Sequence, residues 1–376
     1  MIYLDNSATT RIDDDVVDAM LPWLRDGFGN ASSQYALGRQ ARVAIENARS
    51  EIAGLLGAHP AELIFTSGGT ESNNAILHSM CSESGLVDRL AVGATEHHAV
   101  LHTAEALARR DVDVTVLPVD AHGRIQLDRV VGCNGPRSLI SIMHANNETG
   151  VIQPLSAIRQ SAPDAFLHTD AVQSFGKIPV RVHDLGVDLA TISAHKIHGP
   201  KGIGAMVIRK GLDFKAHQHG GAQERNRRAG TEATALIVGF QHAARRAVAL
   251  MEERARQMQM CRDLARSLVE TMIPDVRINT PMTDVLPNIL NISFRDAERL
   301  DGEAILQQMD IAGIAVSNGS ACVSGSMQPS HVLSAMGVST AEASAAVRYS
   351  VSYQTTTDEI HQAVTLCADI IRNLRV

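Results

Sequence analysis

The stretch SAHKIHGPKGIGA, residues 193–205, places one lysine, Lys196, between two histidines and directly before a glycine-rich segment. Three kinds of site can use such a segment: a metal site on His195 and His198, a phosphate-binding loop, or a lysine that forms a Schiff base with a cofactor. A metal site lacks nearby carboxylates here, and the residue order does not match the Walker loop. From this stretch alone, a Schiff-base lysine and an ordinary surface lysine in a polar turn both remain open.

The length and composition indicate a globular protein. Its 376 residues are 45% hydrophobic and 20% charged, and by length they fit about two domains. The net charge of −7 gives no sign of a nucleic-acid surface. The amino-terminal MIYLDNSATT lacks the basic and apolar regions of a signal peptide, and no apolar run approaches the roughly 18 residues of a membrane span. We therefore expect a cytoplasmic protein with no membrane partner and no direct nucleic-acid partner.

The cysteines follow neither a disulfide pattern nor a zinc pattern, because their number is odd, their spacings are wide and no CxxC pair occurs. Cys322 stands out among them. The stretch SNGSACVSGSMQPS, residues 317–330, surrounds it with small and polar residues, whereas a structural cysteine prefers apolar surroundings. A reactive thiol and an incidental surface thiol both fit this observation. The five cysteines are Cys81, Cys133, Cys261, Cys322 and Cys367.

Apolar strand-like runs alternate with helical patterns such as Ser72–Cys81 and Val100–Ala108. Alternation of this kind predicts an α/β fold with a mostly parallel sheet covered by helices on both faces. Ligands of such sheets bind at the carboxyl ends of the strands. The expected strands are Glu62–Phe65, Leu90–Gly93, Val114–Leu117, Leu139–Met143, Ala165–His168, Leu189–Ile192 and Ala205–Ile208.

A long charged helical run from Leu236 to Ile273 indicates a boundary between two lobes. We place a large domain at residues 15–255 and form a small domain from residues 1–14 and 256–376. The chain closes with an amphipathic helix over Asp358–Leu374, and Thr356 with Glu359 three residues later fits a capping box at its start.

Asp170, in HTDAVQSFGK (168–177), directly follows an expected strand and precedes Lys196 by 26 residues (196 − 170). A buried aspartate at a strand end needs a cationic partner. The protonated ring nitrogen of pyridoxal phosphate (PLP) is such a partner. Capping of the following helix by Asp170 is the alternative.

Further polar residues follow other expected strands. In FTSGGTESNNA (65–75), Gly68, Gly69 and Thr70 form a strand–turn–helix junction that can bind phosphate, although a plain helix cap explains it equally well. His97 in ATEHHAV and Asn147 in HANNETG are weak signals individually. Their common position after successive strands is the stronger signal.

Together these stretches resemble the cysteine desulfurases, PLP enzymes of the class V aminotransferase group with fold type I, and especially the subgroup that serves nitrogen fixation and iron–sulfur assembly. The likeness runs from YLDNSATT to VRYSVS, and the motifs occur in the family's order. They are FTSGGTES, TEHHAV, MHANNETG, HTDAVQSFGK, SAHKIHGPKGIGA, QERNRRAGTE and SNGSACVSGS.

The resemblance implies a role for each matching residue. Lys196 would bind PLP covalently and act as the catalytic base, and Asp170 would pair with the ring nitrogen. Gln173 would contact the ring hydroxyl, and His97 would stack on the ring and assist proton transfer. Cys322 would accept the sulfur atom. Residues implied at the phosphate are Gly69, Thr70, Ser193, His195 and, from a second subunit, Thr231; those implied at the substrate are Arg348 and Asn147.

The implied activity is conversion of L-cysteine to L-alanine by a homodimer, with the sulfur held as a persulfide on Cys322 and passed to a sulfur-acceptor protein for iron–sulfur assembly or another thiolation. No resident metal is implied, and Cys322 would be the candidate ligand of a transient iron–sulfur cluster. The alternative is another PLP enzyme of the same fold, such as a selenocysteine lyase or an aminotransferase. The large domain would bind PLP, and the small domain would carry the reactive-cysteine loop.

Four positions depart from the family pattern. Asn30–Ala31 stands where Asn-Pro is common, and Tyr35 where a histidine is frequent. Ala194 replaces a common glycine, and Tyr353 stands where many members carry an arginine. These departures concern the contacts at the substrate's edge and leave the implied cofactor residues intact.

Overall fold

The computed structural model describes residues 1–319 and 329–375. Within these residues, a seven-stranded sheet has the order β2-β8-β7-β6-β5-β3-β4. Among its described strands, β8 alone runs antiparallel to its neighbours, so the other strands share one direction. The strands are β2 (Leu63–Thr66), β3 (Arg89–Gly93), β4 (Asp113–Leu117), β5 (Ser138–Ser141), β6 (Phe166–Asp170), β7 (Leu189–Ser193) and β8 (Gly204–Ile208). The predicted α/β fold with a mostly parallel sheet is confirmed.

Both faces of this sheet are buried because apolar residues occupy successive positions of its strands. In β2, Ile64 packs with α3 (Gly69–His78) and α4 (His98–Ala108) on one face. Its neighbours Leu63 and Phe65 pack on the other face, as expected for side chains that alternate along a strand. That second face is covered by α1 (Asp14–Arg25), α2 (Ala36–Leu55), α5 (Leu127–Val131), α6 (Leu155–Ser161) and α8 (Thr234–Ala249).

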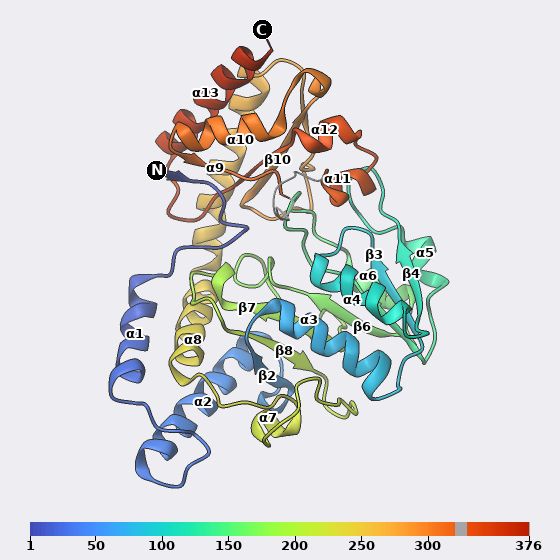
Figure 1. Ribbon diagram of the computed structural model, residues 1–376, viewed down its shortest axis with the longest axis vertical. Coiled ribbons are helices and arrows are strands. Elements are labelled where there is room, and N and C mark those ends of the chain that lie inside the picture. The colour runs from blue at the N-terminus through green and yellow to red at the C-terminus, as the bar shows by residue number, and fades with distance from the viewer. Residues whose placement is uncertain (320–328, 376) are drawn as a thin grey trace.

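A second core lies above the large sheet in Figure 1. It joins the start of the chain to the carboxyl-terminal part, since Ile2 and Leu4 pack with side chains of the closing helix α13 (Thr357–Leu374). The capping box of Thr356 and Glu359 predicted for that helix is confirmed. The other elements of this core are β1 (Ile2–Tyr3), β9 (Val276–Ile278), β10 (Ile289–Phe294), β11 (Ile314–Ala315), β12 (Val347–Ser350), α9 (Met251–Met272) and α10 (Gly302–Ile311).

Some element boundaries differ from those expected. The charged helical run is not one helix, because Leu250 leaves the helical conformation and separates α8 from α9. Strand β6 extends through Asp170, so this residue ends the strand instead of following it. Helix α3 begins at Gly69, three residues earlier than expected, and runs into a π-helical turn, Ser79–Glu83.

For the two lobes we propose the boundaries inferred from the sequence, residues 15–255 for the large domain and residues 1–14 with 256–376 for the small domain. Two separate buried clusters support this division, and α9 leads from one to the other in Figure 1. Residues 332–346 of the second segment still contribute side chains to the large core. Among the described residues, no helix is long and apolar enough to span a membrane.

A buried ion pair joins α2 to the short helix α7 (Gln223–Asn226). The Arg49 guanidinium donates to both Glu224 carboxylate oxygens at 2.7 and 2.8 Å, and both side chains are 2% exposed. Glu224 also accepts a hydrogen bond from the Phe65 backbone at 2.9 Å. The pair therefore fixes the segment that follows β8 against strand β2.

Replacing Glu224 with alanine should lower the free energy of unfolding by about 3–5 kcal/mol, because Arg49 would keep a buried charge without its partner. Urea denaturation followed by circular dichroism measures the change. The control is Glu46→Ala, which removes a half-exposed partner of the same arginine and should cost at most about 1 kcal/mol. Equal losses in the two variants would contradict this account.

Candidate active site

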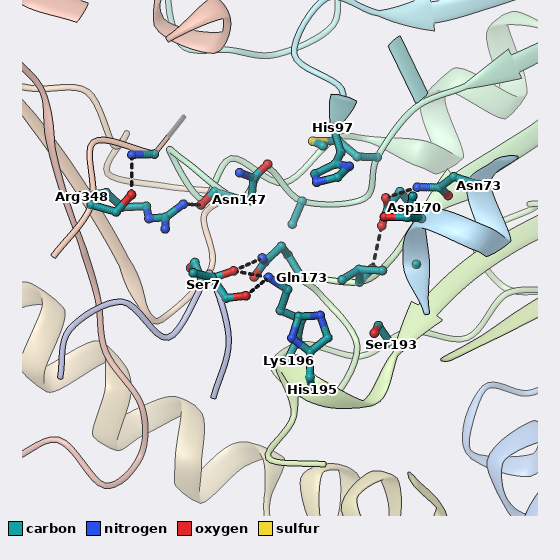
Figure 2. A pocket seen from close by; sticks show the side chains of 18 residues that line it. Ser7, Asn73, His97, Asn147, Asp170, Gln173, Ser193, His195, Lys196 and Arg348 are labelled. Carbon is teal, nitrogen blue, oxygen red and sulfur yellow. Dashed lines mark hydrogen bonds between the residues drawn. The ribbon is translucent and has the colours of Figure 1, made fainter. Parts of the chain in front are cut away.

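A cavity of about 380 Å³ opens at the edge of the large sheet where the parallel strands end. This volume is in the range of small-molecule sites. Segments that follow β2, β3, β5, β6 and β7 line it, as Figure 2 shows. The amino-terminal segment and β12 of the second core also contribute. The predicted residues brought together here are Gly69, Thr70, His97, Asn147, Asp170, Gln173, Ser193, His195, Lys196 and Arg348.

Lys196 ends a single 3-10 turn, Ala194–Lys196, that directly follows β7. Its Nζ donates to the backbone carbonyl of Ala8 at 2.6 Å and to that of Ser7. Burial lowers the pKa of Lys196 to about 8, and the nearby Arg348 charge acts in the same direction. A minor fraction of this amine, about a tenth, is therefore uncharged at pH 7.

Asp170, at the end of β6, presents a buried carboxylate to the cavity. Asn73 donates to its Oδ2 at 2.7 Å, and the Val172 backbone N–H donates to its Oδ1 at 2.9 Å. These two bonds fix the carboxylate plane. The hydrogen bonds leave acceptor capacity on both oxygens for a cationic ligand atom.

The amino terminus of α3 lines one end of the cavity. Gly69 begins the helix, and Thr70 follows it. A β-carbon on Gly69 would lie 2.9 Å from Val172 Cγ2, so the turn depends on glycine to pack against the loop that follows Asp170. Free backbone N–H groups at a helix start favour phosphate.

Ser193 and His195 lie beside this end. Ser193 Oγ is buried and has no hydrogen-bond partner among the described residues. His195 Nδ1 lies 3.2 Å from Thr9 Oγ1. Burial, followed by the charge of Lys196, lowers the pKa of His195 to about 4, so its ring is neutral at pH 7.

His97 caps α4, since its Nδ1 accepts a hydrogen bond from the Ala99 backbone at 3.0 Å. The neutral ring therefore carries its proton on Nε2. Its pKa is lowered, first by burial, although one side of the ring is open to the cavity. His97 can therefore contact a ligand as a neutral imidazole.

The buried polar atoms fit PLP. Gln173 donates through Nε2 to the Ser7 carbonyl at 2.9 Å, which leaves its Oε1 without a partner among the described residues. Ser193 Oγ also has no hydrogen-bond partner among the described residues. One cavity therefore offers an acceptor for a hydroxyl, a donor beside a helix start for a phosphate, a carboxylate for a ring nitrogen and an amine for an aldehyde.

Arg348 reaches the cavity from β12. Its Nη1 donates to the Asn147 carbonyl at 3.0 Å, and its Nη2 donates to Asp5 Oδ1 at 2.5 Å. Its Nε has no partner among the described residues. A guanidinium held in this way can bind the carboxylate of a small amino acid.

Two predicted residues are not placed in this cavity. Thr231 is exposed and is not among the lining residues. Cys322 lies outside the described residues. Of the departures from the family pattern, Tyr35 is exposed and Ala194 is buried, and neither lines the cavity. Tyr353 is also away from it, since its hydroxyl donates to Asp13 at 2.7 Å.

Several contacts were not foreseen from the sequence. Asn73 lies one helical turn after Thr70, and that spacing within FTSGGTESNNA was the available signal for it. Ser7 and Ala8 act through backbone carbonyls, which no side-chain pattern reveals. Asp5 lies 343 residues from its partner Arg348, so the contact depends on the tertiary fold.

Comparisons with known proteins agree with this site. Residues 2–363 match the family described as "Aminotransferase class-V". The cysteine desulfurase IscS of Dictyoglomus turgidum is 43% identical over 100% of this chain and 95% of the relative. A cysteine desulfurase of Bradyrhizobium diazoefficiens is 44% identical, with the same coverage. A solved "NifS-like protein" superposes with a TM-score of 0.91 at 35% identity, covering 99% of each chain. The chain therefore belongs to the class-V aminotransferase family, whose cofactor is pyridoxal phosphate.

Proposed function

We propose that this protein is a cysteine desulfurase that converts L-cysteine to L-alanine and transfers the sulfur through Cys322 to an acceptor protein. The observation that carries the proposal is the cavity that unites Lys196, Asp170 and Arg348. An amine, a carboxylate suited to a ring nitrogen and a guanidinium suited to a substrate carboxylate line this one volume. Relatives at 43 and 44% identity over the full chain are cysteine desulfurases.

PLP supplies an electron-withdrawing ring that makes the α-proton of a bound amino acid acidic. Lys196 would hold the cofactor through Nζ, and its freed amine would take the α-proton at the same atom. Because the pKa of Lys196 is lowered to about 8, its Nζ can hold and release this proton near neutral pH.

The remaining residues orient the reactants. Asp170, fixed by Asn73, would hold a proton on the ring nitrogen, and the free Oε1 of Gln173 would accept from the ring hydroxyl. His97 would contact the ring as a neutral imidazole. Ser193, His195, Thr70 and the Gly69 backbone would bind the phosphate.

At the opposite wall, Arg348 binds the substrate carboxylate beside Asn147. The Cys322 thiolate attacks the substrate sulfur, so an S–S bond forms and the carbon–sulfur bond breaks. The sulfur stays on Cys322 as a persulfide, and the electron pair of the broken bond stays on Cβ. Protonation of Cβ and return of the α-proton to Cα give L-alanine.

We further propose a homodimer that works in the cytoplasm. Thr231 is exposed and outside the cavity, which suits contact with the cofactor phosphate of a second subunit. The described cysteines are all unpaired, as is usual in a reducing compartment. The acceptor would be a scaffold of iron–sulfur assembly or a thiolation enzyme, in keeping with the name IscS of one relative.

The direct test is incubation of the purified protein with L-cysteine and a thiol reductant, followed by quantification of alanine and sulfide. Equal amounts of the two products are expected. Lys196→Ala should lower the rate by roughly 100- to 10,000-fold because it removes the base. Borohydride reduction and peptide mass spectrometry should find PLP on Lys196 of the unaltered protein. A PLP-loaded protein that forms neither product would contradict the proposed function.

Cys322→Ser should abolish formation of sulfide and alanine while the absorbance of bound PLP stays unchanged, because serine cannot accept sulfur. The assay is the same product analysis, together with a visible spectrum. The matched control is Cys133→Ser, a half-buried thiol outside the cavity, which should retain full activity. Normal turnover by Cys322→Ser would refute the assignment of the sulfur acceptor.

Arg348→Met should lower kcat/KM for L-cysteine by roughly 10- to 100-fold, mainly through KM, because it removes a charged hydrogen-bond donor to the substrate carboxylate. Steady-state kinetics measure the effect, and the PLP spectrum reports whether the site is intact. Arg348→Lys keeps the charge but not the two-pronged geometry, so an intermediate KM is expected. Unchanged KM values in both variants would place the carboxylate elsewhere.

A further inference from the structure

A second, smaller cavity lies behind the active site, and Lys196 lines both. Its volume of about 20 Å³ is enough for one water molecule. Lys177 and Asn288 line it as well. The function proposed above uses neither of these two residues.

Lys177 is a buried amine without an acidic partner. Lys177 is 6% exposed, and none of the described carboxylates forms an ion pair with it. Its Nζ donates to the Gln173 carbonyl at 2.9 Å. An unpaired ammonium in such a position is costly, so the neutral amine is favoured.

The backbone and side chain of Gln173 connect the two lysines. Lys177 donates to the Gln173 carbonyl, and Gln173 Nε2 donates to the Ser7 carbonyl at 2.9 Å. That carbonyl also accepts from Lys196 Nζ. The two amines therefore contact one hydrogen-bonded chain and one cavity.

Asn288 gives independent evidence of a ligand in this cavity. It is 1% exposed, and both its side-chain oxygen and its nitrogen lack partners among the described residues. Buried amide groups are almost always hydrogen-bonded, either to protein or to water. A water molecule in the cavity would satisfy Asn288, and both lysines line this same cavity.

The groups around this cavity limit the positive charge that Lys177 and Lys196 can carry together. The other titratable groups that line the cavity are His198, Tyr353 and Arg254. His195 precedes Lys196 in the chain, and Asp13 is the ion-pair partner of Arg254. The two histidines have a pKa of about 4, mainly through burial, and burial raises the pKa of the tyrosine, so all three are neutral at pH 7. The arginine and the aspartate pair at 3.2 Å. Burial and then the charge of Lys196 lower the pKa of Lys177 to about 7.

We propose that Lys177 is a positioning residue that shares one proton with Lys196 through a water in this cavity. A proton leaves the protonated Lys196 nitrogen for the water as the water passes one to the Lys177 amine, so only N–H and O–H bonds exchange. Lys196 returns to the neutral state that its role as base requires, and the pair carries one positive charge instead of two. The inference rests on the proposed role of Lys196.

The test is a pH titration of the visible absorbance of bound PLP in the holoenzyme, which reports the proton on the Lys196 nitrogen. Lys177→Met removes the competing amine, so the midpoint should move up by roughly half a unit to one unit. The acid limb of kcat should move in the same direction. Lys177→Arg keeps a positive charge and should leave the midpoint at or below that of the unaltered protein. The control, Lys210→Met, removes an exposed lysine and should shift nothing.

An unshifted midpoint in folded, PLP-loaded Lys177→Met would overturn the inference, as would equal midpoints in the Met and Arg variants. If the Met variant does not fold, Lys177→Gln answers the same question, because its amide can still donate to the Gln173 carbonyl without carrying charge. A protein without desulfurase activity, or without PLP on Lys196, would instead contradict the proposed function. If the unaltered protein is active but Lys177→Met shows no shift of the midpoint, only the role of Lys177 is contradicted.

Discussion

The site depends on the shared direction of β2, β3, β5, β6 and β7. Parallel strands end at the same edge of a sheet, so the residue after each strand arrives at one place. Five segments that are far apart in the sequence thereby contribute to one cavity. Because β8 returns antiparallel between β2 and β7, the turn before α3 lies near the turn that carries Lys196. The geometry of the site is therefore a consequence of strand direction.

The charges and hydrogen bonds around Lys196 depend on the segments that cover the edge of the sheet. The amino-terminal segment, which belongs to the second core, crosses the cavity and presents carbonyls to Lys196. Arg348 arrives from β12 of the same core, with Asp5 as its partner. Burial and the guanidinium charge lower the pKa of Lys196, while Asp5 and Asp170 oppose this effect. The pKa of Lys196 therefore lies near the pH at which an amine can both take and release a proton.

The buried region extends behind Lys196 into the second cavity, which polar groups also line. Among the described residues, no carboxylate forms an ion pair with Lys177. The interior of a protein of this size usually avoids an unpaired amine. Its position next to a base that must become neutral gives it a physical role. In the mechanism proposed above, this amine and Lys196 share one proton.

The sequence by itself determined the alternation of strands and helices and the residues at strand ends, among them Lys196, Asp170, His97 and Gly69. These signals are local, because a strand, its turn and the following polar residue lie within about ten positions. It also determined the final helix through its capping box. The break at Leu250 escaped prediction; the helix before it packs into the first core and α9 after it packs into the second.

Only the tertiary structure decided which distant groups meet. The bonds of Lys196 to Ser7 and Ala8 span nearly 190 positions, and that of Arg348 to Asp5 spans 343. Backbone carbonyls carry no signal in the side-chain pattern, and a partner so far along the chain is set by how the two cores pack. The cavity that Lys177 and Lys196 share also depends on the tertiary structure, because it lies where both cores enclose one small volume.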